Sequence, residues 1–333
     1  MHLSKFYLNM VNRRQDYLPY LFYKDVSDFP GLFVEKYFFN SFSGDKISGF
    51  CYCYKNPKKI IVFTHGMGAG HKAYLNEIEL FCKKGYKVYT FDIKGCGESE
   101  GNSIGSLYES LADLDAFLKY YKTINKEKVI VIGHSWGAFA SLNILPLHEE
   151  IIEKSIIISG FINLKQLIKS YTKFLYPIFY PAIFSYENHL FPQYSKIDII
   201  RYLNNSKIPL LFIHSKNDNM VLFSYSIKFL QKKVKRTNLS FIILNNRKHN
   251  PYLTDRAFEY YDKIFTCYRK NKKKFTSLDS KKNYFSKVDF HLMMEDDLKL
   301  FDNIFSFSSS VNIFFRRDIT CSVMFSLPSA FNA

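Results

Sequence analysis

The sequence lacks the long apolar runs of a membrane-spanning protein. None of its segments reaches about 18 uninterrupted apolar residues, the length that a membrane helix needs. Its first residues carry charges at Lys5, Arg13, Arg14 and Asp16 without a sustained apolar core, which argues against a secretory signal. We therefore expect a cytoplasmic protein.

Cysteine is scarce and is not spaced as in a zinc site. Cys51 and Cys53 are separated by a single residue, and no second pair of ligands accompanies them. We expect free thiols in a reducing compartment, no bound metal and no cofactor. The six cysteines are Cys51, Cys53, Cys82, Cys96, Cys267 and Cys321.

The sequence also lacks a nucleotide-binding fingerprint. The glycine-rich loop that begins at Gly66 carries His71 where a Gly-x-Gly-x-x-Gly pattern needs its last glycine. The loop at Gly95 and Gly97 meets Glu100 at the same place, and no phosphate-binding Gly-Lys-Ser/Thr ending is present. Nucleotide binding is therefore not expected.

Acidic residues are outnumbered, since 46 Lys and Arg face 30 Asp and Glu, a formal net charge of +16. Most lysines are scattered, and no nucleic-acid motif accompanies them, so we expect no nucleic-acid partner. One cluster, residues 269–274, is expected at a solvated helix end, where cations complement the helix dipole. Weak peripheral contact with anionic lipid headgroups is the alternative.

What the sequence does contain is a serine between two glycines, where a predicted strand meets a predicted helix. Gly133-His134-Ser135-Trp136-Gly137 follows a β-branched run at 129–132 and precedes a helix-compatible segment at 138–142. The glycines let the strand and helix backbones approach closely, so the serine stands on a strained elbow. Ser135 is therefore the candidate nucleophile.

Asp218 and His249 follow two further predicted strands. Each lies in the loop just past an apolar run, at 209–213 and 239–244 respectively. Loops beyond the carboxyl ends of parallel strands converge on one rim of a sheet, so these residues can meet Ser135 there. The chain order Ser, Asp, His is the order found in hydrolases.

With these segments the chain resembles the α/β-hydrolase fold family, specifically its serine hydrolases with lysophospholipase-like and esterase-like members. The resemblance covers roughly residues 33–265, and Lys94 stands where relatives usually have Arg. The segments that carry it are His65-Gly66-Met67-Gly68, the loop from Asp92 to Ser99, the Ser135 elbow, and the loops of Asp218 and His249.

The chemistry of an acyl-enzyme asks for these residue types. His249 can accept the proton of the Ser135 hydroxyl as a general base. Asp218 would fix the tautomer of that imidazole and stabilise its protonated form. The resemblance implies that the backbone N–H groups of Met67 and Trp136 form the oxyanion hole. We predict a hydrolase that cleaves a carboxylic ester, or a related acyl bond, of a small-molecule substrate.

Other histidines and aspartates compete for these roles. Three histidines are predicted to be buried and hydrogen-bonded instead, the first of them shaping the oxyanion loop. Two aspartates stay open as alternatives to Asp218, although one lies in the presumed cap and the other opens a helix, where aspartate often caps. These residues are His65, His134, His214, Asp198 and Asp255.

Two other functions remain open beside the esterase. One is a serine peptidase of the same fold, and the other is a non-catalytic protein that binds membrane surfaces. Dehalogenase chemistry is disfavoured, because by resemblance those relatives carry aspartate at the elbow, where this chain has Ser135. The sequence leaves the oligomeric state open.

Alternating elements predict an α/β fold with a mostly parallel, doubly wound sheet and helices on both faces. Ser106 and Glu109 indicate a capping box before a leucine-rich helix, and residues 292–305 are predicted as one helix. Strands are expected at 34–40, 46–54, 60–64, 87–91, 129–132, 155–159, 209–213 and 239–244, with further helices near 74–84 and 254–265.

We divide the chain into an N-terminal extension at 1–32, an α/β-hydrolase domain at 33–270, a C-terminal helical extension at 271–305 and a disordered tail at 306–333. A small aromatic-rich cap at about 161–206 interrupts the domain. Its aromatic side chains either line an acyl pocket over Ser135 or only pack the cap onto the domain. In the tail, Phe314, Phe315, Arg316 and Arg317 are a minor alternative for membrane contact.

Overall fold

A nine-stranded sheet forms the centre of the molecule. The computed structural model describes residues 2–68, 70–236, 238–310 and 319–320, and side chains between residues 7 and 310. The strand order is β1-β2-β4-β3-β5-β6-β7-β8-β9. The strands are β1 (Phe33–Asn40), β2 (Lys46–Cys53), β3 (Lys59–Thr64), β4 (Tyr86–Phe91), β5 (Val129–His134), β6 (Ile152–Ile158), β7 (Leu210–Ser215), β8 (Leu239–Leu244) and β9 (Ile319–Thr320).

The sheet is parallel from β4 to β9, whereas β2 runs antiparallel to both of its neighbours, β1 and β4. β1 and β2 form a hairpin that turns at Gly44, whose φ of 90° favours glycine. The chain passes from β3 to β4 on one side and then returns to place β5 on the other side of β3. Such a reversal opens a crevice at the carboxyl ends of the two strands, where α/β proteins bind ligands.

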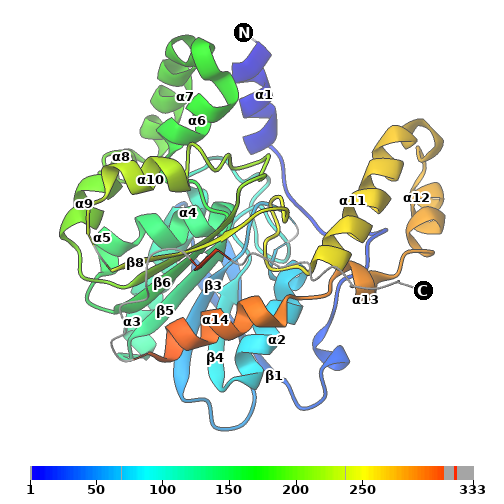
Figure 1. Cartoon of the computed structure of the whole chain (residues 1–333), viewed down its shortest axis with the longest axis horizontal. Coiled ribbons are helices and arrows are strands. Elements are labelled where there is room, and N and C mark those ends of the chain that lie inside the picture. The colour runs from blue at the N-terminus through cyan, green and yellow to red at the C-terminus, as the bar shows by residue number, and fades with distance from the viewer. Residues whose placement is uncertain (1, 69, 237, 311–318, 321–333) are drawn as a thin grey trace, which may run out of the picture.

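Helices cover both faces of the sheet, as the sequence predicted (Figure 1). Among the described helices, none combines the length and apolar character that crossing a bilayer requires. The helices are α1 (His2–Val11), α2 (Leu75–Lys83), α3 (Glu109–Ile124), α4 (Trp136–Asn143), α5 (Leu145–His148), α6 (Leu164–Thr172), α7 (Tyr176–Leu190), α8 (Pro192–Ser195), α9 (Ile199–Asn205), α10 (Ile227–Lys233), α11 (Asp255–Lys270), α12 (Leu278–Phe285), α13 (Phe290–Met293) and α14 (Leu298–Ser309), with 3-10 turns η1 (Val26–Asp28), η2 (His71–Tyr74), η3 (Lys173–Leu175) and η4 (Lys272–Lys274).

The continuous apolar strands bury side chains on both faces because successive side chains point to opposite sides. In β3, Ile60 and Val62 enter a core shared with α3 and α4, whereas Ile61 and Phe63 enter a second core. The second core is closed by α2 and α14 (Figure 1). The predicted α/β fold, with a mostly parallel, doubly wound sheet between two layers of helices, is therefore confirmed.

The segment predicted as a cap contains α6, α7, α8 and α9 between β6 and β7. One buried carboxylate, that of Glu187 in α7, fastens it to the body. Glu187 accepts hydrogen bonds from the Ser106 hydroxyl at 2.5 Å, the Leu107 N–H at 3.1 Å and the Tyr7 hydroxyl. It thereby joins α1, the cap and the start of α3 in one contact.

The predicted capping box at the start of α3 is wrong. The helix begins at Glu109 after Tyr108, and no side chain caps it. The Ser106 hydroxyl bonds to Glu187 instead, and the Glu109 carboxylate pairs with Lys94 at 3.0 Å. Ser106 Oγ keeps one local contact, the N–H of Tyr108 at 2.9 Å, but the bonds to Glu187 and Lys94 replace the reciprocal contacts of a capping box.

The C-terminal region departs from its predicted bounds. The single helix expected at 292–305 is split into α13 and α14, and α14 continues to Ser309. The expected disordered tail from residue 306 therefore begins inside a helix whose Phe307 and Ser308 are buried. The ammonium of Lys154 in β6 caps α14 by donating to the carbonyls of Phe307 at 2.7 Å and Ser308 at 3.2 Å. Residues 314–317 and Cys321 lie outside the described residues.

Candidate active site

The elbow between β5 and α4 holds Ser135 in a conformation that non-glycine residues rarely adopt, with φ 55° and ψ −112°. Its flanking glycines are required by space. A Cβ on Gly133 would lie 2.3 Å from the carbonyl oxygen of Gly137, and a Cβ on Gly137 would lie 2.0 Å from that of Thr64. The close approach of strand and helix that the sequence predicted is therefore present.

Three distant loops bring Ser135, His249 and Asp218 together. The Ser135 Oγ lies 2.8 Å from Nε2 of His249, and Nδ1 of His249 lies 2.9 Å from Oδ2 of Asp218. The other carboxylate oxygen of Asp218 accepts the N–H groups of Met220 and Val221, both at 2.9 Å. The carboxylate is thus fixed in its loop, and it orients the imidazole toward the serine.

The electrostatics keep Asp218 ionised. Burial by itself would raise the pKa of this carboxyl. The hydrogen bond and charge of His249, the charge of His214 and the Val221 N–H outweigh burial, so the pKa of Asp218 lies below its ordinary value. An ionised carboxylate at Nδ1 favours the tautomer in which Nε2 is free to accept the serine proton.

The loop that holds Met67 is braced from several sides. The His65 ring accepts the N–H of Ile93 at Nε2, 2.9 Å away, and donates from Nδ1 to the carbonyl of Gly66 at 2.7 Å. Trp136 opens α4, so its N–H lies outside the helical ladder. Neither the Met67 nor the Trp136 N–H bonds to another residue in the described part of the chain. Both follow neighbouring strands at the crevice.

The competing histidines are engaged elsewhere. His134 accepts the Tyr74 hydroxyl at Nδ1 and donates from Nε2 to the carbonyl of His249, each at 2.8 Å. Burial, and then the nearby His249, lower the pKa of His134 to about 3. His214 donates from Nε2 to the carbonyl of Val221 at 2.8 Å. The predicted buried, hydrogen-bonded roles agree with these contacts.

The competing aspartates do not reach the site. Asp198 caps α9 by accepting the Arg201 N–H at 3.0 Å. Asp255 lies at the start of α11, which Thr254 caps, and pairs with Arg247 at 2.7 Å. Of the three candidate carboxylates, Asp218 is the one that contacts His249.

Tyr74 is a site residue that sequence reasoning missed. Its hydroxyl accepts the N–H of Gly66 at 3.1 Å and donates to His134, so it joins the Met67 loop to the elbow. Because His134 in turn donates to the carbonyl of His249, one buried chain of hydrogen bonds links the Met67 loop, the Ser135 elbow and the His249 loop. The only signal in the sequence was a tyrosine at the start of a predicted helix, which does not reveal these contacts.

The aromatic residues of the cap divide into two groups. Phe191 is buried, and the Tyr176, Tyr180 and Phe184 rings stack along α7. Phe174, in contrast, is 84% exposed. Neither of the two expected roles, lining an acyl pocket or packing the cap onto the domain, describes Phe174.

Within the described residues, no group of three or more His, Cys, Asp or Glu side chains could hold a metal ion. The five described cysteines are free thiols, and they are Cys51, Cys53, Cys82, Cys96 and Cys267.

Comparison with known proteins finds similarity to hydrolases over residues 55–195. A family model described as serine aminopeptidase, S33, matches residues 55–195, which include Ser135 but end before Asp218 and His249. An uncharacterized protein, R595, of Acanthamoeba polyphaga mimivirus is 27% identical over 215 residues, which cover 60% of this chain and 70% of that protein.

Two further similar proteins are described as esterases. Putative esterase/lipase 2 of Mycoplasma genitalium is 30% identical over 97 residues, which cover 28% of this chain and 35% of that protein. The solved structure of esterase Pf2001 from Pyrococcus furiosus superposes with a TM-score of 0.55 at 19% identity, covering 82% of this chain and 99% of that one. The chain spans less than half the length of several other curated relatives that it matches.

Proposed function

We propose that this chain is a serine hydrolase that forms an acyl-enzyme on Ser135. Its similarity to hydrolases over residues 55–195 and its α/β-hydrolase fold support the proposal. The catalytic roles of individual residues are our proposal. The single observation that supports it is the chain of contacts from Ser135 Oγ through His249 to Asp218, at 2.8 Å and 2.9 Å.

In the proposed reaction, Nε2 of His249 takes the proton of the Ser135 hydroxyl as its oxygen attacks the ester carbonyl. The N–H groups of Met67 and Trp136 receive the developing negative charge. The protonated His249 then gives its proton to the leaving alcohol. A water molecule, deprotonated by the same ring, releases the acid and restores the hydroxyl. Asp218 stays ionised and balances the charge of the imidazolium.

The test is labelling with a serine-directed phosphonate, followed by mapping of the adduct. We expect one adduct, on Ser135. Ser135→Ala should abolish it, and His249→Ala should reduce it strongly, because nucleophile and base act as a unit. Ser185→Ala and His189→Ala, which alter exposed residues of α7, are the matched controls. Labelling of His249→Ala at the wild-type rate would remove this residue from the mechanism.

The cytoplasmic location predicted from the sequence remains part of the proposal. We further propose that the preferred substrate is a lysophospholipid-like ester. Faster hydrolysis of a lysophospholipid than of a short aryl ester would support this substrate.

A serine peptidase is the second candidate, favoured by the description of the matching family model. A peptidase should release p-nitroaniline from aminoacyl p-nitroanilides, whereas an esterase should release p-nitrophenol from p-nitrophenyl esters and leave the anilides intact. Absence of both activities and of labelling would leave the non-catalytic, membrane-binding alternative.

The peripheral membrane contact predicted from the sequence also remains a proposal. Of the two segments that suggested it, residues 314–317 lie outside the described structure, whereas residues 269–274 lie within it.

A further inference from the structure

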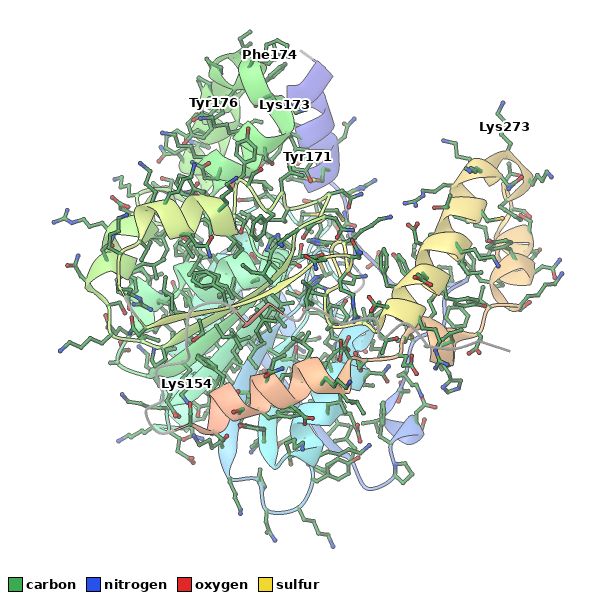
Figure 2. All side chains as sticks on the ribbon, in the orientation of Figure 1. Lys154, Tyr171, Lys173, Phe174, Tyr176 and Lys273 are labelled. Atoms are coloured by element: carbon green, nitrogen blue, oxygen red, sulfur yellow. The ribbon has the colours of Figure 1, made fainter. Side chains whose placement is uncertain are left out.

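Two projections leave the body of the molecule. One is formed by α11, η4 and α12, and the other by α6, η3 and α7 of the cap (Figure 1). Figure 2 shows Lys273 at the far end of the first and Phe174 at the far end of the second, both on the same side of the molecule. The proposed reaction uses neither end.

The end of the first projection, which we name the basic tip, comprises residues 269–282. It carries seven cations against the single acid Asp279, a net charge of +6. None of the seven forms an ion pair within the described part of the chain. The cations are Arg269, Lys270, Lys272, Lys273, Lys274, Lys281 and Lys282. This charge therefore remains available to a negatively charged partner.

The basic tip stands on a packed base. The rings of Tyr268, Phe275, Tyr284 and Phe285 contact one another between the two helices. The Tyr284 hydroxyl also donates to the carbonyl of Ile264 at 2.9 Å. The cations are consequently presented by an ordered element rather than by a free chain.

The end of the second projection, which we name the cap tip, comprises residues 171–178. Its apolar side chains are exposed to solvent: Phe174 is 84%, Ile178 69% and Tyr171 58% exposed. Exposing adjacent apolar side chains to water is unfavourable, and such patches mark sites of interaction. Lysines at 165, 169 and 173 repeat every fourth position along and just past α6, and all three are exposed. Apolar side chains beside cations are the composition of segments that lie in a membrane interface.

Both projections start at the rim that holds the proposed site. The second projection follows the carboxyl end of β6. The first begins with α11, six residues after His249, which lies in the loop that follows β8. The Tyr171 hydroxyl also donates to the carbonyl of Met220, in the Asp218 loop, at 2.6 Å. A flat surface that contacts both tips would therefore face this rim.

We propose that the cap tip and the basic tip together dock the protein on a negatively charged phospholipid membrane. The cap tip enters the headgroup region with Phe174 and Ile178, and the basic tip binds lipid phosphates. Nucleic acid fits less well, because it offers phosphates to the basic tip but no apolar layer to the aliphatic side chains of the cap tip. The binding itself is independent of catalysis, whereas its use in bringing amphiphilic esters to Ser135 rests on the proposed function.

The test is co-sedimentation of the full chain, as Ser135→Ala, with vesicles of phosphatidylcholine alone or mixed with phosphatidylserine. We expect binding to the mixed vesicles, which weakens as salt is added because salt screens the lysines. Replacing Lys272, Lys273 and Lys274 by Glu should weaken binding at least about tenfold, since each cation near such a surface contributes appreciably. Phe174→Ser with Ile178→Ser should weaken it at least about fivefold, through lost apolar burial.

Matched controls come from the opposite rim of the sheet. Charge reversal of Lys55, Lys58 and Lys128, exposed residues in the segments before β3 and β5, should leave binding unchanged, as should Ile124→Ser at the end of α3. Equal loss in these controls, equal binding to neutral vesicles, or no effect of the cap-tip pair would overturn the proposal. So would binding of a DNA duplex that the Lys272–Lys274 reversal removes while vesicles are not bound. Because no turnover is measured, the outcome is separate from that of the labelling experiment.

Discussion

The rim around Ser135 and the cap tip differ in what they bury. The rim buries polar side chains, whereas the cap tip exposes apolar ones. At the rim, Asp218 and His134 are buried and Ser135 and His249 partly buried, and the ring nitrogens of His134 and both Asp218 oxygens have partners within the protein. At the cap tip, apolar side chains face outward, with cations beside them. A change at the rim should therefore act on chemistry and folding, whereas a change at the tip should act on an external contact.

The largest effect is expected at Asp218. Asp218→Asn keeps the shape of the side chain but loses the negative charge that holds the His249 tautomer, so kcat should fall by about 10⁴-fold, as such a change can in a serine triad. KM should change little. Steady-state kinetics on an aryl ester measure both. Asp198→Asn, in the cap, should retain wild-type kcat, and an equal loss there would point to a general rather than local role of charge.

The next largest effect is expected from a steric clash at Gly137 in the elbow. Gly137→Ala places a methyl group 2.0 Å from the carbonyl oxygen of Thr64, against backbone that cannot move aside. Unfolding free energy should fall by about 3 kcal/mol or more, with loss of activity. Gly44→Ala is the comparison, since its Cβ would meet open space and only the positive φ opposes it, at a cost of about 1 kcal/mol. Urea denaturation of the two variants should separate them, and similar values would argue against the tight elbow.

Tyr74→Phe removes one hydroxyl from the chain of hydrogen bonds that joins the Met67 loop, the Ser135 elbow and the His249 loop. The Gly66 N–H and the His134 ring then lose a buried partner, which should cost about 1–3 kcal/mol of stability. If the hydroxyl also positions the Met67 N–H for the oxyanion, kcat should fall while KM stays unchanged, because this N–H acts in the transition state. Tyr171→Phe removes an exposed hydroxyl whose one partner, the carbonyl of Met220, can be hydrated instead, so it should cost less, about 0.5–1 kcal/mol. A kcat unchanged by Tyr74→Phe would limit the tyrosine to stability.

A pH effect follows from His134. Its pKa is about 3 in the folded protein and near 6.5 when unfolded, so between these values only the unfolded chain takes up the proton. Stability conferred by the neutral ring is complete above about pH 6.5 and is lost, by about 1 kcal/mol per pH unit, as pH falls toward 3. His134→Gln should therefore lose less stability than wild type between pH 7 and pH 5, by urea denaturation. Equal losses would show that His134 does not titrate in this way.

The smallest effect is expected from Ile178→Ser. This side chain is 69% exposed, so its replacement should change unfolding free energy by less than about 0.5 kcal/mol. Thermal denaturation measures the change. A loss of more than 1 kcal/mol would mean that the cap tip is packed in the protein, and the contrast with the rim would disappear.

Much of the fold and of the candidate site could be predicted because their signals are local. Apolar runs marked the central strands, and Gly133 and Gly137 marked a close backbone approach. The loops of Asp218 and His249 were found from the strands that precede them. The capping box failed because Glu187 and Lys94, both distant in sequence from their partners, bind Ser106 and Glu109. The bounds of α14 were missed because its end is stabilised by Lys154 from a central strand.

By itself, the sequence determined the alternation of strands and helices and the residue types available at the rim, because both follow from the chemistry of neighbouring residues. Only the tertiary structure decided which polar groups meet. Tyr74, His134 and the loop of His249 are joined by hydrogen bonds between segments far apart in the chain. Partners of buried polar groups are selected by where the packed elements place them, and no local pattern records that placement.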